Sequence, residues 1–149
     1  LDRSSAASDV YKRQGQLWPS ARDRLEVAFS EYAGSGASEG LGAQYVGNVV
    51  TALQKTQRAE EAVDLSSWAL PVAAKTNNPK ETLFTLCDNA VSLFCCGCFE
   101  ESAMVFESVH QRAREACDAE AMGWAVNYLR DFGVFSGSPA YSQALQRLR

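Results

Sequence analysis

Residues 77–102 read NNPKETLFTLCDNAVSLFCCGCFEES, and this stretch decides the fold class. Asn78 can cap a helix, Pro79 suits the first helical position, and Glu81 follows at the third. Apolar residues then recur at helical spacing until Gly97, which predicts a helix that ends at that glycine. They are Leu83, Leu86, Ala90, Val91, Leu93 and Phe94. A second helix is expected over residues 99–117, so the stretch predicts a helical hairpin.

Similar patterns extend to both sides of this hairpin. Residues 20–33, 41–55 and the stretch from 59 onward each predict a helix, as do two segments capped by Asp118 and Ser138. Pro71 lies inside the third of these patterns and is expected to kink that helix or end it early, because proline lacks an amide hydrogen. No segment shows convincing strand alternation, so we predict an all-α fold.

The helices recur in pairs. Three segments align on an asparagine, NVVTAL at 48–53, NAVSLF at 89–94 and NYLRDF at 127–132, and lie 41 and 38 residues apart. Residues 59–62 and 99–102 are offset by 40. Such a period is the size of one helix–turn–helix unit. A single hairpin leaves an apolar face uncovered, so neighbouring hairpins are expected to stack.

The segment GCFEES at 97–102 resembles the turn of tetratricopeptide repeats, Gly-x-Tyr-x-x-Ala. The resemblance covers residues 20–149 and implies a right-handed α-solenoid of antiparallel helical hairpins over residues 18–149. This domain would hold about three repeats after a leading helix. Gln57 in place of the turn glycine, extra turn residues at 137–139 and a period above about 34 residues depart from the family pattern. HEAT or another α-solenoid is the alternative.

The family resemblance also implies a binding surface. In tetratricopeptide proteins the first helix of each pair lines a concave groove, where asparagines bond to the backbone of an extended peptide. On this chain the implied residues are Asn48, Asn89 and Asn127, flanked by Thr51, Ser92 and Arg130. The alternative is structural, because such an asparagine can satisfy a neighbouring hairpin. Counted back from Gly97, moreover, Asp88 rather than Asn89 falls at the family's position.

The five cysteines invite a metal or redox interpretation. They are Cys87, Cys95, Cys96, Cys98 and Cys117. Their spacing matches no zinc pattern, and we interpret them as small apolar residues at tight helix turns, with no metal or cofactor. The odd, clustered count favours a reducing cytoplasm. His110 lies on a predicted solvated face and has no nucleophile signature nearby, so no enzymatic activity is expected.

Composition narrows the classes of partner. With a net charge of −4, the chain lacks the excess of basic residues typical of a nucleic-acid-binding protein. It also contains no apolar run of membrane-spanning length. We therefore expect a protein or peptide partner, bound by a scaffold in its concave groove, with Trp124, Tyr128 and Tyr45 as candidate anchors. The alternative is a sensory or coupling arm of a larger bacterial signalling or transcription-regulatory protein.

The first residues stand apart from the repeat. Residues 1–14, LDRSSAASDVYKRQ, resemble a translated sequencing-library adapter, as occurs in metagenomic open reading frames. The segment is polar and lacks periodicity, so we expect residues 1–17 to form a disordered or artefactual tail. We also expect the chain to be a piece of a longer protein.

Overall fold

A computed structural model describes residue 23 and residues 39–75 and 78–149 of the 149-residue chain. The tail of residues 1–17 and the helix predicted over residues 20–33 lie outside the described residues. The side chain of Tyr45 is also outside those described.

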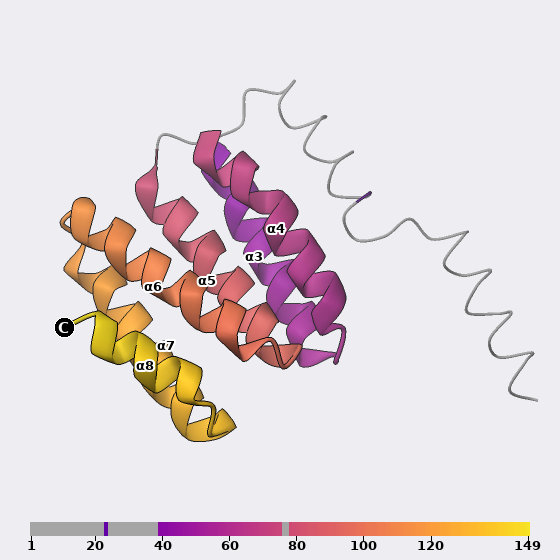
Figure 1. Ribbon diagram of the computed structural model, residues 1–149. Helices are drawn as coiled ribbons and strands as arrows, with labels where there is room; N and C mark the ends of the chain where they lie inside the picture. Colours follow the sequence, from indigo (N-terminus) through magenta and orange to yellow (C-terminus); the bar gives the residue numbers. More distant parts are fainter. Residues whose placement is uncertain (1–22, 24–38, 76–77) are drawn as a thin grey trace, which may run out of the picture. The chain divides into compact units, whose positions relative to one another are not determined.

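Within the described residues the chain consists of helices joined by short turns and contains no strand, which confirms the all-α prediction. The helices follow one another as a succession of antiparallel neighbours, coloured from purple to yellow in Figure 1. Their bounds are α3 Glu39–Lys55, α4 Ala59–Lys75, α5 Pro79–Cys95, α6 Phe99–Glu115, α7 Ala119–Ser136 and α8 Pro139–Arg147.

The predicted caps open three of these helices. The side chain of Asn78 accepts a hydrogen bond from the Lys80 backbone N–H at 3.1 Å, ahead of α5. Asp118 accepts from the Ala121 N–H at 3.0 Å, ahead of α7, and Ser138 from the Ala140 N–H at 3.3 Å, ahead of α8. Each cap satisfies a helix N–H that has no partner within the helix, so the sequence fixes where these helices start.

A left-handed residue follows four of the described helices, α3, α5, α6 and α7. Gly97 and Gly137 have φ angles of 78° and 66°, and the non-glycine residues Gln57 and Cys117 adopt 59° and 56°. After Gly97, the Cys98 N–H donates to the Leu93 carbonyl at 3.0 Å, the bond that closes a Schellman motif. Gln57 therefore takes the backbone conformation of the turn glycine that it replaces.

Pro71 does not end α4 early, contrary to one of the two predicted outcomes. The helix continues past Pro71 to Lys75. Ala69 and Ala73, one turn apart on either side of the proline, are 4% and 2% exposed. Because both alanines are buried on the same face, packing holds the helical path beyond the residue that lacks an amide hydrogen.

The structural period is forty residues at the helix starts and at the left-handed turns that follow the first helices. First helices start at 39, 79 and 119, second helices at 59, 99 and 139, and left-handed turn residues lie at 57, 97 and 137. The alignment on asparagines, with spacings of 41 and 38, is therefore not the structural register. The equivalents of Asn48 are Asp88 and Tyr128.

Consecutive helices pack against each other throughout, and first helices also contact first helices, α3 with α5 and α5 with α7. The second helices α6 and α8 touch, whereas α4 and α6, both described, do not. A contiguous apolar core runs through the last two hairpins. Its fully buried members include Ala90, Phe106, Val109, Ala125, Leu129 and Tyr141.

Candidate functional site

Two of the six predicted binding residues are buried between helices. Asn89 is 6% exposed, and its Nδ2 donates to the hydroxyl oxygens of Ser66 and Ser67 on α4, each at 3.0 Å. Ser92 is fully buried and accepts a hydrogen bond from Gln54 of α3 at 2.9 Å. Both side chains join neighbouring hairpins, which is the structural role left open for an asparagine at this place.

The other four lie at or near the surface. Asn48, Asn127 and Arg130 are exposed, and Thr51 is half-buried with its hydroxyl donating to the Gly47 carbonyl at 2.9 Å. Arg130 donates to Asn127 Oδ1 at 2.9 Å and pairs with Asp131. The structure thus brings Asn127 and Arg130 together but does not align the three asparagines in one row.

A different row of side chains links α5 to α7. Lys80 on α5 forms an ion pair with Glu120 on α7, its counterpart forty residues later. One turn on, the rings of Phe84 and Trp124 lie 4.5 Å apart between centroids, and these two are also counterparts. Residues four apart lie on one face of a helix. We call the set the α5–α7 ladder: Lys80, Phe84 and Asp88 on α5 with Glu120, Trp124 and Tyr128 on α7.

Asp88 and Tyr128 occupy the third pair of equivalent positions, forty residues apart. Burial raises the pKa of the Tyr128 hydroxyl, with smaller electrostatic contributions from Cys87 and Asp88. The Tyr128 ring stacks on buried Phe106 at 5.0 Å between centroids. One face of the Tyr128 ring is thus packed against the core, while part of the side chain stays accessible.

The aromatic rungs are open to solvent. Phe84 is 52% exposed, Tyr128 is 38% exposed and Trp124 is half-buried. Lys80 Nζ lies 5.5 Å from the centre of the Trp124 ring, within cation–π range. Adjacent exposed rings flanked by charged groups are typical of protein interaction surfaces.

Asp88 is the electrostatically unusual group of the ladder. Its Oδ2 packs against α3 at Gly47, where an added Cβ would lie only 3.0 Å away. Burial raises the pKa of Asp88 to about 6. The neighbouring Cys87 thiol has its pKa raised to about 12 by burial and by the charge of Asp88. A carboxyl group with so perturbed a pKa is a candidate functional residue.

Sequence reasoning found part of this ladder. Trp124 and Tyr128 were candidate anchors and Asp88 fell at the family's position, but Phe84, Lys80 and Glu120 were not singled out. The missing signal was the register. Counting forty residues from cap to cap, rather than from asparagine to asparagine, pairs Lys80 with Glu120 and Phe84 with Trp124.

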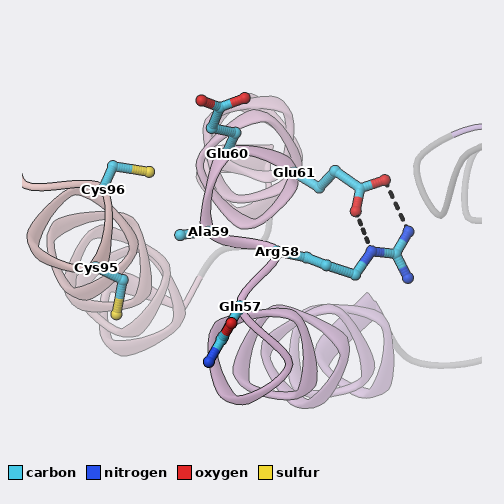
Figure 2. Close-up of a pocket in the computed structure, with 7 residues that line it drawn as sticks. All are labelled: Gln57, Arg58, Ala59, Glu60, Glu61, Cys95 and Cys96. Atoms are coloured by element: carbon cyan, nitrogen blue, oxygen red, sulfur yellow. Dashed lines mark hydrogen bonds and ion pairs between the residues drawn. The ribbon is translucent and has the colours of Figure 1, made fainter. Parts of the chain in front are cut away.

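A second feature is an open pocket of about 410 Å³ between the turn that joins α3 to α4 and the end of α5, drawn in Figure 2. Arg58 and Glu61 form an ion pair at its side, and Cys96 points across it toward Glu60. Burial raises the pKa of both the Cys95 and the Cys96 thiol. These thiols are therefore protonated at neutral pH, which disfavours a nucleophilic role.

The cysteines form no metal site in the part of the chain that is described. All five are free thiols there, and no three histidine, cysteine or acidic side chains converge as ligands would. His110 was predicted on a solvated face, and that prediction is wrong, because the residue is 6% exposed. It lies one turn from buried Phe106 and Ala113 on the same face of α6. Burial, and secondarily Arg114, lowers its pKa.

None of the described helices is long and apolar enough to cross a membrane. In comparisons with known proteins, no family model, curated protein or solved structure matches this chain.

Proposed function

We propose that this chain is a protein-interaction module of tetratricopeptide type, whose hairpins form a right-handed solenoid and whose first helices bind a peptide or a partner helix. The observation that carries the proposal is the α5–α7 ladder with its exposed aromatic rings. Phe84 and Tyr128 keep 52% and 38% of their surface accessible although neighbouring apolar residues are buried.

Two features of the fold support the solenoid. Helix starts and the left-handed turns after the first helices repeat every forty residues, as expected for stacked units of one kind. First helices contact first helices, so that α3, α5 and α7 contribute to one surface. Equivalent positions on those helices carry Asn48, Asp88 and Tyr128, one side chain from each hairpin.

The proposed binding surface differs from the row of asparagines expected from the sequence. Asn48 stays in it as an exposed amide that both donates and accepts hydrogen bonds. Thr51, Asn127 and Arg130 stay as polar groups beside it. Asn89 and Ser92 act instead between helices, and the aromatic rungs supply the anchors. The role is binding without catalysis.

Selection of random dodecapeptides displayed on phage tests the proposal. Peptides enriched on the wild-type protein should lose at least about tenfold in affinity for Phe84→Ala, as interface anchors do. Phe84 is more than half exposed, so this variant should stay folded. Met104→Ala on α6 is the matched control, because Met104 is also exposed, at 65%, and lies on a second helix.

Three results would count against a first-helix binding surface. They are a selection that enriches no peptide, enriched peptides that bind Phe84→Ala as tightly as wild type, and an equal loss of affinity for Met104→Ala. Circular dichroism spectra of each variant, recorded alongside, separate lost binding from lost structure.

A further inference from the structure

The Asp88 carboxylate lacks a cationic partner among the described residues. It packs against α3 where Gly47 leaves room, and neither Gly47 nor the nearby α3 residues Asn48 and Thr51 carry a charge. Lys80, the cation of the α5–α7 ladder, lies two turns away and is already paired with Glu120. A half-buried carboxylate without a counter-charge is costly, so the site favours a ligand that supplies one.

The groups around Asp88 suit a cation in particular. Tyr128 and Cys87 lie within electrostatic reach and remain neutral near pH 7, because the pKa of each is raised. Asp131, further along α7, is paired with Arg130. No other cation of the described first helices is directed at the carboxylate. The local field is therefore negative, and burial alone raises the pKa of Asp88.

Aromatic faces flank the same place. Phe84 precedes Asp88 by one helical turn, and Tyr128 is the counterpart of Asp88 on α7 and lies within its electrostatic reach. Both rings have exposed surface. The ammonium group of Lys80 beside Trp124 shows that this row of rings accepts a cation at a distance of 5.5 Å from the ring centre. Aromatic faces attract cations through their quadrupole, and more strongly when water is displaced.

We propose that the α5–α7 ladder binds a basic side chain, lysine or arginine, of its peptide partner, with Asp88 as the counter-charge and Phe84 and Tyr128 as the flanking aromatic surfaces. This inference rests on the proposed peptide-binding function and names the chemical class of its partner. The alkyl part of the basic side chain would cover the rings, and its charged end would reach the carboxylate.

Fluorescence anisotropy with defined peptides tests the inference. The probe is fluorescein-labelled Gly-Ala-Leu-Lys-Ala-Phe-Lys-Leu-Gly, with companions in which both lysines become arginine, glutamine or glutamate. The lysine and arginine peptides should bind about tenfold tighter than the glutamine peptide, and the glutamate peptide weaker still. Raising the salt concentration should reduce the advantage of the basic peptides.

The variant Asp88→Asn assigns the preference to one group. It should reduce the affinity of the lysine peptide to that of the glutamine peptide. Glu100→Gln is the matched control, because it removes the same unit of charge from the exposed first turn of α6. It should leave the preference intact, which separates a local counter-charge from the general attraction of a chain with net charge −4.

The outcomes that overturn the inference are distinct from failure of the proposed function. If all four peptides bind equally and Phe84→Ala weakens them all, the surface binds peptides without selecting charge, and only the inference fails. It also fails if Asp88→Asn leaves the lysine peptide unaffected, or if no probe binds. The phage selection decides independently whether the chain binds peptides at all.

Discussion

The two junctions between successive hairpins are built from different interactions. Where the first hairpin meets the second, side-chain amides bridge the helices: Gln54 to Ser92, and Asn89 to Ser66 and Ser67. Where the second meets the third, aromatic rings stack, with Phe94 and Phe132 only 3.9 Å apart between centroids. The directional bonds fix how α3, α4 and α5 are aligned, and the rings supply buried apolar area.

The contacts between helices differ in the same way. At the aromatic junction the second helices α6 and α8 touch, and Glu107 on α6 pairs with Arg147 on α8 at 2.6 Å. At the amide junction α3 packs on α5, while α4 and α6 stay apart. One repeat can therefore join its neighbours through either chemistry, provided that its first helices meet.

Phe106→Ala should have the largest effect on this comparison. Phe106 is fully buried and its ring lies against those of Tyr128 and Phe132. Removing the ring should lower the free energy of unfolding by about 3–5 kcal/mol, measured by urea denaturation. Phe106→Leu is the conservative control and should cost less. A loss below about 1 kcal/mol for the alanine variant would show that the aromatic junction contributes little stability.

Asp88→Asn should stabilise the protein at neutral pH, by about 1–2 kcal/mol. The pKa of Asp88 rises from 3.8 to about 6 on folding, so the native state favours the protonated form. Below pH 3.8 the carboxyl group is neutral in both states, and its ionisation costs no stability. Above pH 6 it is charged in both states, and burying the charge lowers the free energy of unfolding by the full amount. Thermal melts of both proteins should therefore coincide near pH 4 and separate by pH 7. A constant difference across this range would contradict the assignment.

Asn89→Ala breaks the amide junction and should cost about 1–2 kcal/mol in urea denaturation. The loss arises because the hydroxyls of Ser66 and Ser67 lose their shared donor. A double-mutant cycle with Ser66→Ala sharpens the result, since the two changes should be less than additive if the side chains interact. Additive losses would mean that the bond between them contributes nothing to the junction.

Gln57→Gly should give the smallest effect, a stabilisation of about 0.5–1 kcal/mol seen as a higher melting temperature. Glycine adopts the φ angle of 59° without the strain that a side chain meets there. The reverse change in the second hairpin, Gly97→Ala, should destabilise by a similar amount, because Gly97 has a φ angle of 78°. Equal responses at both turns would show that the two hairpins close by one geometry.

Local chemistry made the helices predictable from the sequence. Asn78, Asp118 and Ser138 act through neighbours two or three residues away, so their caps are visible in a short window. The burial of His110 could not be predicted from its sequence neighbours alone. Charged neighbours suggested an exposed face, yet its side chain is buried, because burial depends on which helices pack around α6.

The candidate site was harder to predict because it depends on register between distant segments. Asn89 and Asn127 are each offset by one residue from the positions equivalent to Asn48, and on a helix one residue rotates a side chain by about 100°. Asn89 is consequently directed at α4 rather than at a partner. The pairing of Phe84 with Trp124 became evident only once both helix starts were fixed.

The constant forty-residue spacing has a consequence for how such a chain can grow. Tandem duplication of residues 79–118 would return every cap, turn and helix to an equivalent place, since the copied segment begins and ends at matching boundaries. A duplication whose length is not a multiple of forty residues would leave a helix without its start or its stop. Unequal recombination between like segments would thus lengthen or shorten the protein by whole hairpins, and each new hairpin would add one first helix to the same surface.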